Sequence, residues 1–199
     1  MDWTQIIRSA QQYLEHGGMV IPPLLLVMFV LWYALGYRWV TIRRGDRRSV
    51  RVLIERQRSG KRRPPRGIVD AAVEKAVQVA GTPRPDIRRH LDEALAGYEQ
   101  KVKKYDRLVG TLVVVAPLLG LLGTVSGMIE TFTSLGEGAF HSRSGGISGG
   151  ISEALYTTQF GLTVAIPGII IGRILRRRQQ AILGELAKIK DLVILASGS

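Results

Sequence analysis

The chain has 199 residues, 28 Lys and Arg against 16 Asp and Glu, 46% hydrophobic residues and no Cys. This composition excludes a disordered chain and a small secreted domain stabilised by disulfides. A mean hydropathy of +0.11 beside 22% charged residues is contradictory for one soluble core, unless apolar and charged residues occupy separate segments that meet different solvents. With no Cys and three widely spaced His, a metal site has little support, and we expect no cofactor and no enzymatic activity.

Residues 1–16 carry apolar side chains at helical spacing, separated by polar ones. This pattern predicts a short amphipathic helix that lies on the outer membrane surface. An uncharged segment, 17–37, follows, and its helix is expected to begin near Ile21 because Pro22 and Pro23 stand where missing N–H groups cost least. Polar residues precede this segment and basic residues follow it, which argues against a cleaved signal peptide.

Three segments carry no charged side chain: residues 17–37, 108–129 and 154–172. A helix rises about 1.5 Å per residue, so crossing a hydrocarbon layer of roughly 30 Å takes about 20 residues. The three segments have 21, 22 and 19 residues, and each is long enough to span a membrane. The sequence therefore predicts an all-α integral membrane protein with three transmembrane helices.

The remaining segments predict helices that extend beyond the membrane. In residues 38–107, breaks at 59–67 and 81–85 separate short helical patterns. From Asp86 to about Thr133 there is no Pro or Gly cluster, which predicts a helix that crosses from cytoplasm to membrane without interruption.

Residues 130–153, rich in Gly and Ser, predict a short external loop. The helical pattern of the third span continues through residues 173–199 to about Ile194. Long membrane helices extended into a cytoplasmic helical bundle are therefore the expected architecture.

The distribution of basic residues predicts the orientation. Residues 38–107 hold 20 Lys and Arg against 9 Asp and Glu, and residues 173–199 hold 6 against 2, whereas each outer segment holds a single basic residue. The N-terminus is expected outside and the C-terminus inside.

The cytoplasmic basic residues are expected to lie beside anionic lipid headgroups. The expected contacts are Arg38, Arg43, Arg44, Arg173 and Arg176. No aromatic residues interleave the basic run at 56–66 and no nucleic-acid-binding motif is present, so we expect no nucleic acid partner.

Small residues recur at helical spacing in the second and third spans, including Gly120, Gly123, Gly127 and Gly161. Such faces let helix backbones approach closely. The small face of the third span could meet that of the second or line a narrow pore. Because three helices of one chain cannot bury all the small residues, we expect the faces to pack against neighbouring copies in a closed ring. Pro117 and Pro167 predict kinks, since neither can bond to the carbonyl four residues earlier.

Two hydroxyls suggest an ion path. Thr124 lies five residues before the outer end of its span, and Thr158 lies five residues after Glu153 at the outer end of the next, so both are expected at one depth. The alternative is that each hydroxyl only bonds back to its own helix.

Glu153 borders the apolar segment, where a carboxylate is either functional or stabilised by the helix N-terminus. No ionisable residue lies in the middle of any span. If protons cross here, a partner must supply the group that carries them.

Two stretches carry a family resemblance: residues 116–128, APLLGLLGTVSGM, and residues 150–167, GISEALYTTQFGLTVAIP. Together they resemble the MotA/TolQ/ExbB proton-channel family. The chain has three predicted spans rather than four, and in this it resembles the ExbB/TolQ branch of the family. The sequence departs from the pattern at Tyr156 and Gln159, where apolar residues are expected.

The resemblance implies a pentamer that surrounds the single transmembrane helices of a dimeric ExbD/TolR-like partner, whose membrane Asp carries the proton. It also implies that Thr124 and Thr158 line the pore and face that Asp. Glu153 is similar to the Glu at the head of the third span, and Pro167 to the proline within it.

The resulting hypothesis is a subunit of a motor in the bacterial inner membrane that is driven by proton motive force. Its output would be energising TonB-type outer-membrane transport or an envelope process, with a TonB- or TolA-like protein as a further partner. One alternative is a membrane scaffold whose basic cytoplasmic bundle docks a soluble partner or anionic lipid. A basic nucleic-acid-binding membrane protein is the other.

Overall fold

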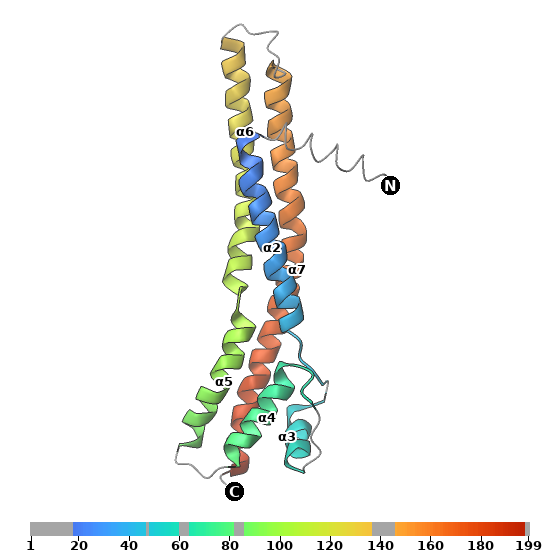
Figure 1. The fold of residues 1–199 in the computed structure, drawn as a ribbon, viewed down its shortest axis with the longest axis vertical. Helices are drawn as coiled ribbons and strands as arrows, with labels where there is room; N and C mark the ends of the chain where they lie inside the picture. Colours follow the sequence, from blue (N-terminus) through green and yellow to red (C-terminus); the bar gives the residue numbers. More distant parts are fainter. Residues whose placement is uncertain (1–17, 47, 60–63, 82–85, 137–145, 198–199) are drawn as a thin grey trace, which may run out of the picture. The chain divides into compact units, whose positions relative to one another are not determined.

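The computed structural model describes residues 18–46, 48–59, 64–81, 86–136 and 146–197, and all regular elements in these residues are helical (Figure 1). The elements are η1 (Gly18–Val20), α2 (Ile21–Thr41), α3 (Val50–Arg58), α4 (Ile68–Ala80), α5 (Ile87–Lys103), α6 (Asp106–Gly136) and α7 (Gly146–Ser197). The predicted all-α class is thus confirmed for the described part of the chain. The amphipathic helix expected in residues 1–16 lies outside it.

Three helical stretches are long and apolar enough to cross a membrane, namely Ile21–Thr41, Ile87–Gly136 and Ile147–Ala196. This confirms the expected number of spans. Helix α2 begins at Ile21, as predicted, with the two prolines in its first turn. It ends at Thr41, four residues beyond the expected end of the span, because arginine is a good helix former and Arg38 limits the uncharged stretch without ending the helix.

The connection between α6 and α7 is shorter than the loop predicted for residues 130–153, since α6 continues to Gly136 and α7 already begins at Gly146. The expected loop boundaries were set by the charges of Glu130 and Glu153. Glutamate is a good helix former, so these residues mark a limit of the apolar segments while the helices run on.

The second long helix is interrupted, and the prediction of an unbroken helix from Asp86 is wrong. Helix α5 ends at Lys103 and α6 begins at Asp106, and Tyr105 between them has a φ of 61°, in the left-handed region. The Tyr105 ring packs edge-on against Tyr37 of α2, with ring centroids 5.1 Å apart. The Lys104 ammonium lies 5.0 Å from the centroid of each ring. Tertiary contacts rather than Pro or Gly therefore accompany this break.

The chain forms two compact units. The first comprises Met1–Ala34 and Arg107–Ile171, and the second comprises Leu35–Asp106 and Gly172–Ser199. In the first unit, α6 and α7 run side by side with α2 beside them (Figure 1). In the second unit, α4 packs against both α3 and α5.

An ion-pair network joins α5 to the end of α7 in the second unit. The Lys190 ammonium lies 2.7 Å from a carboxylate oxygen of Asp92 and 2.9 Å from one of Glu99. Burial disfavours the charged ammonium, but hydrogen bonds to the two carboxylates outweigh it and raise the pKa of Lys190 above its ordinary value. Lys190 therefore stays charged over the physiological pH range.

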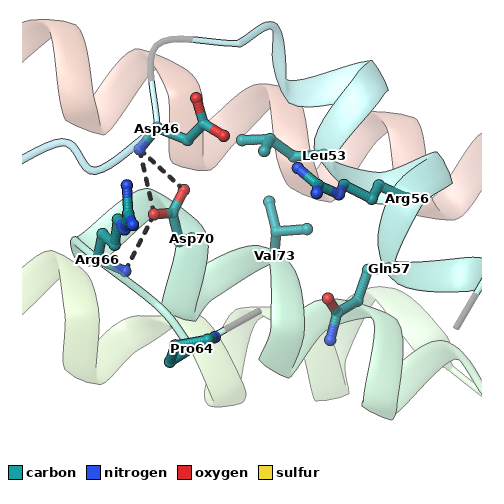
Figure 2. Close-up of a pocket in the computed structure, with 8 residues that line it drawn as sticks. All are labelled: Asp46, Leu53, Arg56, Gln57, Pro64, Arg66, Asp70 and Val73. Carbon is teal, nitrogen blue, oxygen red and sulfur yellow. Dashed lines mark hydrogen bonds between the residues drawn. The ribbon is translucent and has the colours of Figure 1, made fainter. Parts of the chain in front are cut away.

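Asp70, in the first turn of α4, ties down the segment between α2 and α3. Its carboxylate accepts hydrogen bonds from the backbone N–H of Asp46 at 3.1 and 3.2 Å and of Arg66 at 3.1 Å (Figure 2). Gly45, beside this carboxylate, has a φ of 97°, a conformation that side-chain-bearing residues rarely adopt. The segment leaving α2 is thereby fixed against the start of α4.

Replacing Asp70 by alanine is expected to lower the free energy of unfolding by about 1.5–3 kcal/mol, because backbone N–H donors lose a charged acceptor. Thermal unfolding in detergent, followed by circular dichroism, measures the change. Glu74→Ala is the control, since Glu74 lies one turn further along α4 and makes no hydrogen bond or ion pair with the described residues. Equal unfolding temperatures for the two variants would contradict this role of Asp70.

Candidate ion path along the second and third membrane helices

Helices α6 and α7 pack through the predicted small residues. A Cβ atom placed on Gly120 would lie 3.0 Å from the Thr157 carbonyl oxygen, and one on Gly161 would lie 2.8 Å from that of Ala116. Gly127 lies against the backbone of Gly150 at the other end of the contact. The helices are therefore antiparallel and close enough that only small residues fit between them.

The small faces of the two spans meet within one chain, which is one of the arrangements that the sequence allows. The glycine face of α6 does not need neighbouring copies, because α7 of the same chain buries it. The three contact glycines of α6, with Thr131 on the same face, are all buried within one chain.

The contact also depends on Thr157, which the sequence reasoning missed. Thr157 is fully buried and its side chain occupies the space above Gly123. Its hydroxyl donates within its own helix, to the carbonyl oxygens of Glu153 (3.0 Å) and Ala154 (3.1 Å). The available signal was its spacing, three residues after Ala154 and four before Gly161, which places it on the small face of α7.

Thr124 and Thr158 lie at the edge of this contact, and both are half-buried. Each stands one residue after a contact residue, Gly123 on α6 and Thr157 on α7. On antiparallel helices this spacing turns both side chains to the same side of the contact, because a right-handed helix advances by about 100° per residue. The structure thus brings the two predicted hydroxyls to one side of the helix pair, which we call the threonine side.

The two hydroxyls reach neighbouring backbone carbonyls of α6. Thr158 lies beside Gly120, and its hydroxyl is 3.3 Å from the Gly120 carbonyl oxygen and 3.2 Å from that of Ala154. Thr124 donates at 2.6 Å to the carbonyl oxygen of Leu121, the residue after Gly120, and successive carbonyls differ by about 1.5 Å along a helix. Both hydroxyls donate to helix carbonyls and keep oxygen lone pairs available to accept.

Glu153 lies on a different side of α7. It stands five residues before Thr158, which separates the two side chains by about 140° around the helix. Glu130 on α6 is a neighbour of the half-buried carboxyl of Glu153, so two acidic side chains lie close together at this end of the helix pair. Sequence reasoning placed Glu130 at the start of the loop and did not identify this pair.

The two prolines lie inside continuous helices, Pro117 in α6 and Pro167 in α7. Next to the second proline, Gly168 packs against Leu31 of α2 and Val113 of α6; a Cβ there would lie 2.9 and 3.0 Å from their side chains. Gly168 therefore lets α2 approach the other two helices closely.

The predicted lipid contacts fall into three groups. Arg38 is only 2% exposed and binds Asp106 (2.7 Å) and Gln179 (2.6 Å), so its assignment as a lipid-facing residue is wrong. Its long apolar stem and two hydrogen-bonding partners make burial possible.

The other predicted contacts are less buried. Arg44 pairs with Glu185 at 2.8 Å, and Arg176 lies 3.3 Å from Asp106. Arg43 and Arg173 are exposed.

The apolar stretches of the two helices carry no charged side chain. Neither α6 between Arg107 and Glu130 nor α7 between Glu153 and Arg173 carries a charged residue or a histidine. Within the described residues, no group of three or more His, Cys, Asp or Glu side chains could hold a metal ion. On one side of the tightly packed helix pair, these stretches offer the hydroxyls of Thr124 and Thr158.

Known proteins resemble this chain over most of its length. It is 31% identical over 186 residues to "Putative biopolymer transport protein ExbB-like 3" of Synechocystis sp., covering 85% of this chain and 87% of that protein. It is 33% identical over 196 residues to "Putative biopolymer transport protein ExbB-like 1" of the same organism, covering 86% and 72%.

A more distant relative is "Biopolymer transport protein ExbB" of Salmonella typhimurium, 29% identical over 118 residues, or 55% of this chain and 48% of that protein. The model of the MotA/TolQ/ExbB proton channel family matches residues 61–188. The second and third membrane helices, with both hydroxyls and the glycine contact, fall within that match. The chain belongs to the MotA/TolQ/ExbB proton channel family, and its relatives place it in the ExbB-like branch.

Proposed function

We propose that this chain is a subunit of a proton-driven motor in the bacterial inner membrane, with its N-terminus outside and its C-terminus inside. Five copies surround the single-span helices of an ExbD/TolR-like dimer, and proton flow past that partner turns one part relative to the other. The observation that carries this proposal is the placement of two hydroxyls on one side of the α6–α7 pair, in a membrane segment without any charged residue or histidine.

The geometry of the hydroxyls suits a carboxyl group that alternates between two states. In the structure Thr124 and Thr158 donate to helix carbonyls, so their lone pairs can accept a hydrogen bond from the neutral form of the partner's carboxyl. When that carboxyl ionises, each hydroxyl can rotate and donate to it. Both states of the carrier therefore find a partner at a place where water is scarce.

Glu153 has a different proposed role, because it lies away from the threonine side and near the outer end of α7. Glu130 is a second carboxyl at this end of the helix pair, and we expect the two acidic side chains to concentrate protons there. At the inner surface, Arg43 and Arg173 remain as proposed contacts for anionic headgroups, since both are exposed.

The proposal is tested by a Thr124→Val, Thr158→Val double variant, which keeps the side-chain shapes and removes both hydroxyls. The loss of hydrogen bonds to a buried carboxyl costs about 1–3 kcal/mol, which slows ion transfer roughly tenfold or more if it is felt at the barrier. Motor-dependent transport is measured in a complex that still assembles with its partner.

Thr133→Val provides the matched control. Thr133 is an exposed threonine of α6 whose hydroxyl also bonds back to its helix, at 2.9 Å from the Ile129 carbonyl oxygen. Its loss should leave transport unchanged. Full activity of the assembled double variant would show that the two site threonines only pack, and the assigned ion path would be wrong.

A further inference from the structure

Gln159 places an amide on the side of the third membrane helix that points away from α6. It stands two residues after the buried Thr157, which turns it about 160° away from the contact with α6. Its neighbours on this side are exposed apolar residues: Leu155, Leu162, Ile166 and Ile170, with exposed fractions of 67%, 45%, 54% and 56%. We call these five residues the back face of α7.

Thr163, one turn beyond Gln159, shows why the amide is unusual. The Thr163 hydroxyl donates to the backbone carbonyl of Gln159 at 2.8 Å, so this polar side chain is satisfied within its own helix. The Gln159 amide makes no hydrogen bond with the described residues. In addition, Pro167 has no N–H to bond the Thr163 carbonyl.

Lipid tails offer no hydrogen bond to either group, so a back face turned to lipid would leave them unsatisfied. The polar groups therefore indicate that another transmembrane helix covers this face.

The matching surface lies on α6 of the same unit. Leu118, Leu122 and Val125 each stand two residues from a contact glycine and point away from α7, with exposed fractions of 57%, 52% and 51%. We call these three residues the back face of α6. The two back faces lie on opposite sides of the helix pair, each turned away from the contact between α6 and α7. The threonine side lies between them.

We propose that the back face of α7 docks a second copy of this chain, with Gln159 hydrogen-bonding to the back of α6 in that copy. The inference rests on the proposed ring, because identical units placed side by side bring the back of α7 in one against the back of α6 in the next. Such a head-to-tail contact closes into a ring when repeated. It leaves the threonine side free to face the partner helices.

Symmetry sets the depth of this contact. All copies in a ring lie at the same depth, and Gln159 is next to Thr158, which lies beside Gly120. Gln159 therefore faces the neighbouring copy between its Leu118 and Leu122.

Disulfide cross-linking tests this register, and the chain has no native Cys to interfere. A Gln159→Cys, Leu122→Cys variant oxidised in membranes is expected to give a ladder of cross-linked copies. Gln159→Cys combined with Ile129→Cys is the control, because Ile129 is also exposed but lies about two turns, roughly 10 Å, further along α6. A ladder from the control pair alone, or from neither pair, would overturn the contact.

A second measurement tests the amide itself. Gln159→Leu is expected to raise the dissociation constant of the oligomer in detergent about threefold per interface, the typical effect of one hydrogen bond between membrane helices. Thr163→Val should leave it unchanged, since that hydroxyl is satisfied internally. An unchanged or tighter oligomer for Gln159→Leu would mean that the amide is not an interface contact.

The two proposals fail in different ways. If native mass spectrometry finds the wild-type chain only as a monomer, the ring of the proposed function is overturned, and this contact with it. If the wild-type ring forms but both tests of Gln159 fail, the ring stands and the assignment of the back face is wrong.

Discussion

Gly127→Val is expected to abolish the stable packing of α6 against α7. A Cβ on Gly127 would meet the carbonyl oxygen of Gly150 and would lie 2.9 Å from the backbone nitrogen of Ala154. Both obstacles are backbone atoms of a continuous helix and cannot move aside as a flexible side chain would. Overpacking in a well-packed interior costs about 1–3 kcal/mol, and the two methyl groups of valine add to the first clash.

Thermal unfolding of the purified chain in detergent measures this effect. Gly136→Val is the matched control, because Gly136 lies on the same helix and a Cβ added there would meet no atom within 4 Å. The control should unfold near the wild-type temperature, while the Gly127 variant unfolds much lower or fails to accumulate. Similar stability of the two variants would mean that α6 and α7 are not in contact at this point.

Arg38→Met is expected to be the most damaging change in the second unit. The arginine is almost completely buried and joins α2 to Asp106 at the start of α6 and to Gln179 of α7. Breaking a buried ion pair by removing one partner costs about 3–5 kcal/mol, because the other charge is left without compensation. Asp106 is 24% exposed and keeps Arg176 at 3.3 Å, so the lower end of that range is expected.

Two further variants separate the ion pair from the volume of the side chain. Arg38→Met with Asp106→Leu removes both charges and should recover part of the lost stability. Arg43→Met removes an exposed arginine of the same region and should change the free energy of unfolding by less than about 0.5 kcal/mol. If Arg38→Met is as mild as Arg43→Met, the buried pair does not hold these helices together.

The number of membrane helices was predictable, because a bilayer accepts only long stretches of sequence without charge. A stretch of about 20 residues without charge has few alternatives to a membrane helix, and the chain has three such stretches. The ends of the helices were less predictable for the same reason. Charges such as those of Glu130 and Glu153 mark where apolar sequence ends, while backbone hydrogen bonding continues beyond them.

The break at Lys104 and Tyr105 could not be read from local sequence, since neither residue is a helix breaker. Its accompanying contacts involve Tyr37, 68 positions earlier than Tyr105 in the chain. Arg38 was misassigned for a similar reason. A basic residue after a span is ordinarily at the lipid surface, and only the fold brings Asp106 and Gln179 around it.

The types of residue in the candidate site were predictable. The helix that each of these residues packs against was only partly predictable. Small residues at helical spacing indicated close helix packing, and the structure confirms such packing for Gly120, Gly123 and Gly127. That the partner would be α7 of the same chain depends on how the helices pair, which one sequence does not encode locally. Thr157 was overlooked because a buried threonine and a pore-side threonine stand next to each other.

Proton uptake by proteoliposomes is the measurement that tests the central claim most directly. Vesicles containing this chain together with its ExbD-like partner are given a membrane potential, and internal pH is followed with a fluorescent dye. The account predicts uptake that requires both proteins, is lost when the partner's membrane carboxyl is replaced by its amide, and is reduced roughly tenfold or more by the Thr124→Val, Thr158→Val change. Uptake by this chain alone, or uptake by the pair that is insensitive to both changes, would contradict it.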